Sequence, residues 1–242
     1  MSYQWNWGVF LQPSASGDDT YLGWMLAGFK MTIALSLTAW VLALLLGALI
    51  GVLRTVPNKA LAGFATGYVE LFRNVPLLVQ LFIWYFVLPE LLPESIGNAY
   101  KQSNPMLQQF LASMVCLALF TSARVAEQVR SGINSLPRGQ KNAGLALGFT
   151  LPQTYRFVML PMAFRLVVPP LTSEFLNIFK NSAVCSTIGL MELAAQGRQL
   201  VDYTAQPYES FIAVTLSYIA INVVVMTLMH KFARRLAVPG YI

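Results

Sequence analysis

The feature that most constrains this chain is an uninterrupted apolar run near its start. Met31 to Leu53 contains 23 residues without a charge and is bounded by Lys30 and Arg54. A helix of about 20 apolar residues is long enough to cross a bilayer. Only 11% of all residues are charged, 56% are hydrophobic and the mean hydropathy is +0.58, whereas an ordinary soluble domain carries about 25% charged residues. The sequence therefore predicts an integral membrane protein.

Four further apolar segments follow, so we expect an all-α, polytopic membrane helical bundle of about five transmembrane helices in one domain, residues 1–242. The predicted spans are 24–54, 68–92, 106–132, 163–188 and 208–233. The fourth is the least regular, because it carries Glu174, Lys180 and the pair Pro169-Pro170. Prolines free backbone carbonyl groups that then need another partner. We therefore expect that helix to have a broken or water-exposed end.

The basic residues predict the orientation of the spans, because Lys and Arg concentrate on the cytoplasmic side. They cluster in alternate connecting segments: residues 54–59, 130–165 and 231–235 are rich in Lys and Arg, and the intervening segments are more acidic. The N-terminus is thus predicted outside and the C-terminus in the cytoplasm. No cleaved signal sequence is indicated at the N-terminus.

The net charge of +6 does not indicate nucleic-acid binding, because the basic residues lie between apolar runs, where membrane topology places them. The two cysteines, Cys116 and Cys185, lie in apolar stretches without C-x-x-C spacing. Small buried side chains are the simplest interpretation, and the sequence supports neither a disulfide nor a metal site. We expect no cofactor.

The longest segment between spans on the basic side is residues 134–161. From Arg130 to Arg165 the chain has five basic residues and no acidic one, and prolines divide it. Because prolines stop or start helices, we expect two or three short helices lying across the membrane face. The small residues between Ala143 and Gly148 would let another backbone come close. A plain cytosolic connector is the alternative, and composition alone leaves both open.

This segment resembles the EAA loop of ABC importer permeases. That family pattern is Glu-Ala-Ala, three residues, Gly, nine residues, Ile-x-Leu-Pro. Here Asn142-Ala143-Gly144, Gly148 and Val158-Met159-Leu160-Pro161 match its spacing without a gap. Asn142 stands where Glu is usual, and Gly144 stands where the second Ala is usual.

Three more elements are similar to the polar-amino-acid branch of these permeases. Residues 70–80 resemble its E-x-x-R-x-x-P-L-x-x-Q signature, residues 126–140 its A-E-x-x-R-x-G-I-x-S-I-P-x-G-Q signature, and residues 180–182 its K-[ND]-[ST] element. Four such matches in the family's order extend over about 115 residues. The resemblance implies a MetI-like ABC importer permease fold.

The resemblance also implies partners and a bacterial cytoplasmic (inner) membrane location. A coupling helix around residues 140–150 would dock in a groove of a separate ABC ATPase subunit, which would hydrolyse ATP as a dimer. A second permease subunit, identical or related, and an extracytoplasmic solute-binding protein would complete the importer. The residues expected at the ATPase contact are Asn142, Ala143, Gly144, Leu147, Gly148 and Phe149.

Charged residues inside the predicted spans need a partner or a function, because a charge in hydrocarbon is costly. Arg124, Glu127 and Arg130 are spaced by three residues, close enough to interact on one helix. They predict either a structural ion-pair cluster or a site where Arg124 faces the solute pathway. Glu70 and Arg73 are expected to form a structural pair.

The fourth span offers a second polar group. Lys180, Asn181 and Ser182 supply a cation and hydrogen-bonding groups that could bind an amino-acid carboxylate or connect helices. In having an arginine at position 124, the chain resembles the branch of the family that handles glutamate and aspartate. Our hypothesis is that Arg124 and Lys180 receive an acidic amino acid.

Two other classes of protein are alternatives. An ion-coupled secondary transporter or channel would show inverted repeats and acidic groups within the membrane. Five spans cannot be divided evenly into two repeats, and Glu174 is the single acidic residue that could couple transport to an ion within the membrane. An intramembrane enzyme is not indicated, because H-E-x-x-H, G-x-S-x-G and G-x-x-x-x-G-K-[ST] are all absent from the sequence. We therefore expect a transport subunit and not an enzyme.

Overall fold

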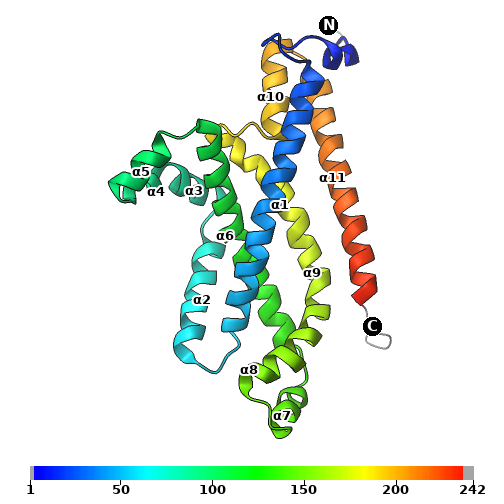
Figure 1. The fold of residues 1–242 in the computed structure, drawn as a ribbon. Helices are drawn as coiled ribbons and strands as arrows, with labels where there is room; N and C mark the ends of the chain where they lie inside the picture. The colour runs from blue at the N-terminus through cyan, green and yellow to red at the C-terminus, as the bar shows by residue number, and fades with distance from the viewer. Residues whose placement is uncertain (1–2, 237–242) are drawn as a thin grey trace. The chain divides into compact units, whose positions relative to one another are not determined.

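The structure is a computed structural model that describes residues 3–236, and throughout that range its regular elements are helices (Figure 1). One isolated antiparallel bridge joins Pro13 to Thr20. The prediction of an all-α protein is confirmed. In chain order the helices are η1 (Trp7–Leu11), α1 (Tyr21–Leu53), α2 (Lys59–Asn74), α3 (Leu77–Phe82), η2 (Ile83–Val87), α4 (Leu88–Leu91), α5 (Glu94–Lys101), α6 (Pro105–Asn134), α7 (Arg138–Ala146), α8 (Leu151–Thr154), η3 (Tyr155–Met159), α9 (Leu160–Asn181), η4 (Ser182–Ile188), α10 (Leu193–Thr204) and α11 (Pro207–Leu236).

The long helices and one broken pair account for the apolar length of the chain. By length and composition α1, α6 and α11 can each cross a membrane, and α2 with the α3–α4 segment forms a fourth, broken candidate. Among the described residues, α9 does not reach the same combination of length and hydropathy. α9 still continues through Pro169 and Pro170 as one helix. Its regular geometry ends instead at Asn181, where the 3-10 segment η4 begins.

The second predicted span differs from a single continuous helix. α2 begins at Lys59, nine residues before the predicted start, and the α-helix ends at Asn74. Pro76 follows the break, and Val75 has the extended backbone that the residue before a proline prefers. A helix resumes at Leu77 and widens into a π-helical turn, η2, before α4.

The described chain divides into two compact units. The first contains the chain up to Ala39 together with Leu77–Leu117 and Asn177–Val224. The second contains Trp40–Pro76, Ala118–Leu176 and the chain from Val225 onward.

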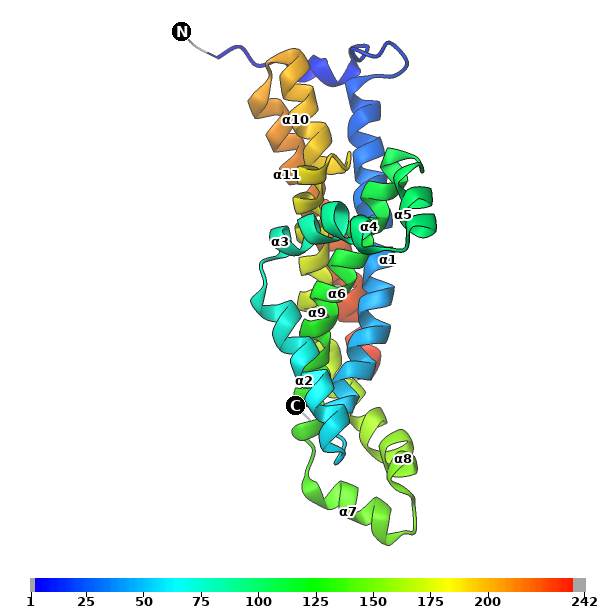
Figure 2. The same ribbon diagram turned by 90° about the vertical axis from the view of Figure 1, so that its left-hand side faces the viewer.

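The first unit is organised around a cluster of buried apolar side chains from η1, α1, α10 and α11. Its members are Val9, Tyr21, Met25, Leu193, Leu200 and Val214. In Figure 2, α10 and the start of α11 lie together beside the N-terminal segment. The carboxylate of Glu209 on α11 fastens that segment, since it accepts hydrogen bonds from the Tyr3 hydroxyl and, at 2.6 Å, from the Asn6 backbone nitrogen.

The second unit brings α1 and α6 into close contact through two glycines. A Cβ atom at Gly47 would lie 2.7 Å from the Ser122 carbonyl oxygen, and one at Gly51 would lie 2.7 Å from the Ala126 carbonyl oxygen. Small residues four apart let membrane helices approach backbone to backbone. The α1–α6 approach therefore excludes any larger residue at these two positions.

Candidate coupling segment and solute-pathway residues

The helix α7 ends in a backbone geometry that requires Gly148. Its φ angle is +84°, in the left-handed region that glycine enters without steric cost. The Phe149 nitrogen donates to the Gly144 carbonyl oxygen at 3.2 Å, and the Gly148 nitrogen donates to the Leu145 carbonyl oxygen at 3.0 Å. These two bonds form a Schellman motif, which satisfies the last carbonyl groups of the helix.

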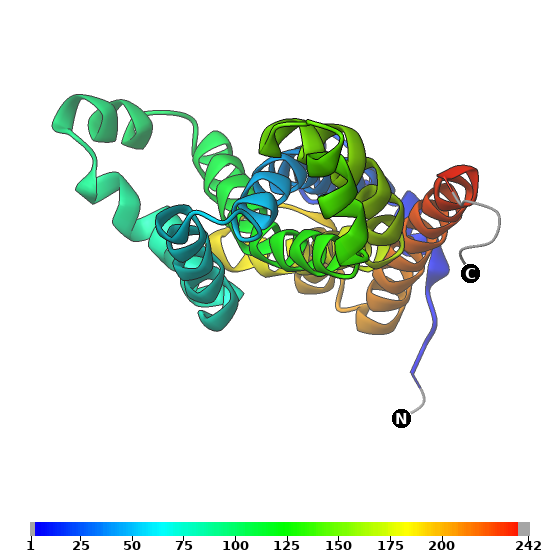
Figure 3. The same ribbon diagram turned by 90° about the horizontal axis from the view of Figure 1, so that it is seen from below.

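A second short helix begins directly after this turn. The Thr150 side chain caps α8 and exchanges hydrogen bonds with Gln153, which is a capping box. α8 continues through the π-helical turn η3 into α9. In Figure 3, seen from below, the green segment that contains α7 and α8 faces the viewer. The segment 134–161 thus contains two short helices joined by a tight, fully capped turn.

The small residues of α7 serve two different purposes. Gly144 is buried, and a Cβ atom there would lie 2.8 Å from the Thr154 side chain, so this glycine lets α7 pack on α8. The residues facing outward are larger. Leu147 is 77% exposed, Leu145 42% and Phe149 38%. Asn142 and Ala143 are also exposed. The close approach that Gly144 permits in this structure is to Thr154 of the same chain.

Glu127 on α6 is the centre of an ion cluster. Its carboxylate pairs with Arg54 and Arg130, and an Arg73 nitrogen lies 3.6 Å away. Arg54 is the most buried of these arginines, with an 11% exposed side chain. One carboxylate therefore connects the end of α1, α2 and α6 within the second unit.

The expected ion pairs are only partly those observed. Glu127 and Arg130 pair as the three-residue spacing predicted. Arg73 was expected to pair with Glu70, but its ionic partner in the structure is Glu127, and Glu70 is exposed. Arg124 is not part of the cluster, since the ion pairs of the described residues include none with Arg124.

Arg124 lies in an unusual environment for a cation. Its guanidinium carbon is 4.0 Å from the centre of the Phe120 ring, a cation–π arrangement. The Nη1 atom is buried and has no hydrogen-bond partner in the structure. A buried guanidinium nitrogen without an acceptor is energetically unfavourable. An anionic or carbonyl group supplied from outside the chain would satisfy it.

The polar group at the end of α9 separates into exposed and buried parts. Lys180 is exposed, Asn181 is partly buried and Ser182 is fully buried. The Ser182 hydroxyl donates a 2.7 Å hydrogen bond to the Phe179 carbonyl oxygen. This bond helps to end α9, so the serine stabilises the transition from α9 into η4. Lys180, in contrast, is exposed and accessible to a ligand.

Beyond η4, Glu192 holds the start of α10. Its carboxylate accepts hydrogen bonds from the Ala194 and Ala195 nitrogens at 3.0 and 2.8 Å and from the Tyr218 hydroxyl at 2.8 Å. Burial raises the pKa of this carboxyl group, against the lowering effect of the backbone and Tyr218 hydrogen bonds. Glu192 was not among the residues expected from sequence to matter.

Sequence reasoning also missed the partners that hold the segment 134–161 in place. The Tyr155 hydroxyl donates to the Thr55 carbonyl oxygen at 2.7 Å and lies 3.2 Å from the Thr55 hydroxyl. Around it, Ile133, Leu136 and Met159 form a buried cluster. The spacing of Gly47 and Gly51 was a readable signal for helix contact. No signal in the sequence indicated the Tyr155–Thr55 contact, because 100 residues separate its partners.

Comparison with known proteins places this architecture in a family. Residues 43–238 match the family described as binding-protein-dependent transport system inner membrane component. The glutamate/aspartate import permease protein GltJ of Escherichia coli (strain K12) is 58% identical over 241 residues, which is 99% of this chain and 98% of that protein. The glutamate/aspartate import permease protein GltK of Escherichia coli O6:H1 is 28% identical over 97% of this chain and all of its own length.

A solved structure agrees with these sequence relatives. The crystal structure of an amino acid ABC transporter with histidines contains a chain that superposes with a TM-score of 0.75 at 30% identity, covering 89% of this chain and 95% of that one. The fold predicted from the EAA-type pattern is therefore confirmed. This chain belongs to the family of inner-membrane components of binding-protein-dependent transport systems.

Proposed function

We propose that this permease subunit serves an ATP-driven importer of acidic amino acids, glutamate or aspartate. The observation that carries the proposal is the Arg124 site within a sequence 58% identical to a glutamate/aspartate import permease. The guanidinium is held over an aromatic ring and keeps one buried nitrogen without an acceptor. The side-chain carboxylate that distinguishes these two amino acids from neutral ones would supply that acceptor.

Lys180 and Asn181 are proposed as further members of the solute pathway. Lys180 is exposed at the end of α9, where the chain leaves regular helical geometry. An amino acid carries an α-carboxylate as well as any side-chain charge, so two cationic contacts along the route suit a dicarboxylic solute. Ser182 would keep Lys180 in place through its hydrogen bond to Phe179.

Uptake assays on the assembled importer test this proposal. Arg124→Ala should lower glutamate and aspartate uptake at least tenfold, because one charge-assisted hydrogen bond is worth about 1.5–3 kcal/mol, and Arg124→Lys should retain part of it. Lys59→Ala, which removes an exposed cation at the start of α2, is the matched control and should leave uptake unchanged. Unaltered uptake in Arg124→Ala would remove this residue from the pathway.

We also propose that α7 and the turn after it dock on the ATPase. Leu145, Leu147 and Phe149 are exposed apolar side chains on a rigid, capped segment, and such a segment can pack into an apolar groove and transmit motion without bending. Gly148→Asp or Gly148→Trp should abolish uptake while membrane insertion is retained. Survival of transport in either variant would contradict the docking assignment.

The complete importer is proposed to contain two permease subunits, two ATPase subunits and an extracytoplasmic solute-binding protein. GltJ and GltK carry the same substrate in their names, which favours a related second permease over a second copy of this chain. Purification of the tagged subunit in mild detergent, followed by mass spectrometry, should recover a distinct permease and an ATPase. Recovery of this chain alone with the ATPase would favour the homodimer.

The proposed topology has five crossings with the N-terminus outside and the C-terminus in the cytoplasm. Lys231, Arg234 and Arg235 at the end of α11, and the basic segment containing α7, then lie on the ATPase side. Labelling of single cysteines introduced at Gly17 and Arg235 with a membrane-impermeant reagent should modify position 17 alone in intact spheroplasts. Isolated protein in liposomes that moved amino acids down an ion gradient without any ATPase would support a secondary transporter instead.

A further inference from the structure

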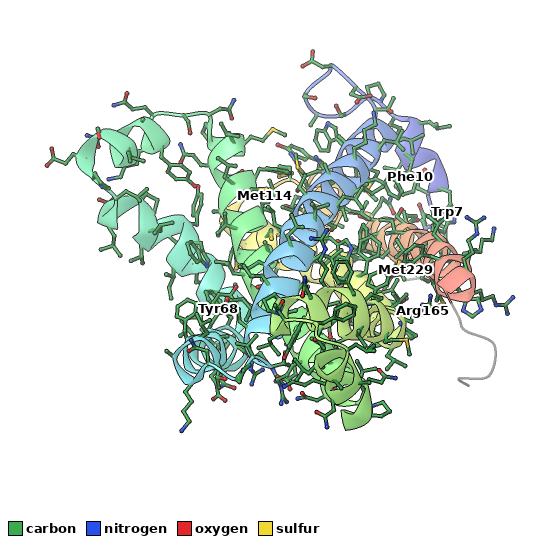
Figure 4. The ribbon with its side chains drawn as sticks, turned by 60° about the horizontal axis from the view of Figure 1, so that its bottom comes forward. Trp7, Phe10, Tyr68, Met114, Arg165 and Met229 are labelled. Atoms are coloured by element: carbon green, nitrogen blue, oxygen red, sulfur yellow. The ribbon has the colours of Figure 1, made fainter. Side chains whose placement is uncertain are left out.

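A cavity of about 540 Å³ in the second unit lies among the α6–α7 connection, α9 and the end of α11. Its volume is within the range of small-molecule sites in proteins. Figure 4 shows Arg165 on α9 beside the part of α11 where Met229 is labelled. None of the residues proposed for the solute pathway lines this cavity, and of α7, the helix proposed for the ATPase contact, Gln140 is the residue in its lining.

The cavity has basic side chains in its lining. Arg165, His230 and Arg234 line it, and none of the described residues that line it is acidic. Neither arginine has a carboxylate within 4 Å among the ion pairs of the described residues. Arginine presents a planar set of donors that suits phosphate oxygens. Two unpaired arginines at one cavity therefore favour an anionic ligand, and a phosphate in particular.

The same helices also contribute apolar side chains to the cavity. Met226 on α11 is 55% exposed and Leu166 on α9 is 43% exposed, and both line the cavity with Pro169. A free inorganic anion would leave these side chains uncovered. A ligand that joins an anionic group to hydrocarbon chains would cover the basic and the apolar residues together, and this is the chemistry of a phospholipid.

Gln140 on α7 narrows the class of headgroup. The residue lines the same cavity, and its side-chain oxygen is buried and has no hydrogen-bond partner in the structure. A buried acceptor of this kind calls for a donor. The glycerol hydroxyl groups of phosphatidylglycerol are donors next to a phosphodiester, whereas the headgroup of phosphatidylethanolamine adds a cation that the arginines would repel.

We propose that this cavity is a binding site for an anionic phospholipid with a hydroxylated headgroup, of which phosphatidylglycerol is the simplest. Its phosphate lies between Arg165 and Arg234, a headgroup hydroxyl donates to Gln140, and an acyl chain follows Leu166 and Met226. Basic pockets between membrane helices are known to suit anionic lipid headgroups. Because Gln140 is in α7, the lipid connects α9 and α11 to the segment that we propose as the ATPase contact.

Lipid retention in the assembled importer tests the proposal. The importer with its partner subunits is purified in mild detergent from cells whose membranes contain phosphatidylglycerol and phosphatidylethanolamine, and bound lipid is quantified by native mass spectrometry. Arg165→Gln should lower phosphatidylglycerol occupancy about fivefold, and Arg165→Gln/Arg234→Gln about 25-fold, since about 1 kcal/mol per basic residue corresponds to a factor of about five. Arg235→Gln, an exposed arginine on the same turn that does not line the cavity, should leave occupancy unchanged.

A second measurement distinguishes a lipid from a free anion. Addition of phosphatidylglycerol to the delipidated importer should raise its thermal transition, whereas inorganic phosphate or glycerol 3-phosphate at equal concentration should not. Equal stabilisation by inorganic phosphate would overturn the lipid assignment. So would equal phosphatidylglycerol occupancy in the double variant and the natural protein, which is also the result expected if the second permease fills the cavity. Uptake activity is not needed for either readout, so the outcome is independent of the proposed solute.

Discussion

The hydroxyl group of Tyr155 donates a hydrogen bond of 2.7 Å to the carbonyl oxygen of Thr55, 100 residues earlier in the chain. Tyr155 opens the π-helical turn η3 directly after α8, and Thr55 follows the end of α1. The tyrosine side chain is buried, with 6% exposed. The segment that we propose as the ATPase contact is thus anchored to the end of α1 by a partly buried polar contact.

Removal of this hydroxyl should loosen the anchor. Tyr155→Phe should lower the free energy of unfolding by about 1 kcal/mol, the net value of a typical hydrogen bond, and should lower uptake per ATP hydrolysed, because α8 would then move partly independently of α1. Uptake and ATPase rates measured on the same proteoliposomes give this ratio. Tyr203→Phe, at a tyrosine that is 58% exposed, is the control; an equal change in both variants would mean that the Tyr155 contact has no special role.

The Schellman turn after α7 should be sensitive to any side chain at position 148. Gly148→Ala forces an L-residue into φ +84°, which costs about 1–2 kcal/mol, although nothing lies within 4 Å of the added Cβ atom. Hydrogen exchange of the α7 amides in the assembled importer should become faster by about tenfold, and uptake should fall.

Gly139→Ala is the matched control for that experiment. Gly139 is exposed inside α7, has no positive φ, and a Cβ atom there also meets nothing within 4 Å. Alanine is favoured over glycine in a helix by up to about 1 kcal/mol, so exchange in α7 should become slower. Faster exchange in both variants would show that the added methyl group itself, and not the positive φ angle at Gly148, changes hydrogen exchange in α7.

The ion cluster should be the most costly site to disturb in the second unit. Glu127→Gln leaves three arginines without their shared carboxylate and should lower the free energy of unfolding by about 2–3 kcal/mol, the range for hydrogen bonds to charged groups. Glu70→Gln removes an exposed charge in the same unit and should change it by less than about 0.5 kcal/mol. Denaturation in detergent micelles compares the two, and similar values would contradict the cluster's structural role.

Glu192 should make stability depend on pH. Burial raises the pKa of its carboxyl group in the folded protein, above an ordinary value of about 4.3. Its protonated form is therefore favoured by folding, so this contribution to stability is fully present below the ordinary pKa and is lost as pH rises through the raised one. Glu192→Gln is neutral at every pH and should remove this component. Thermal transitions of both proteins between pH 4 and pH 8 should diverge with rising pH; parallel curves would exclude the effect.

Local signals in the sequence were enough to predict the helices and the family. The charge-free run from Met31 lies within α1, and the prolines of residues 134–161 separate α7 from its neighbours. Gly148 stood in the family pattern, and its backbone angle explains why glycine suits that place. These features depend on residues near one another in the chain, where hydropathy and turn chemistry act directly.

The partners of individual polar groups were decided by tertiary structure. Periodicity could pair Glu127 with Arg130, three residues away, but Arg54 joins the same carboxylate from 73 residues away. Likewise, only the packing of α7 on α8 shows that Gly144 faces Thr154. Spacing along a helix reveals which side chains share a face. Which face meets which helix depends on the packing of all of them, and that information is not local in the sequence.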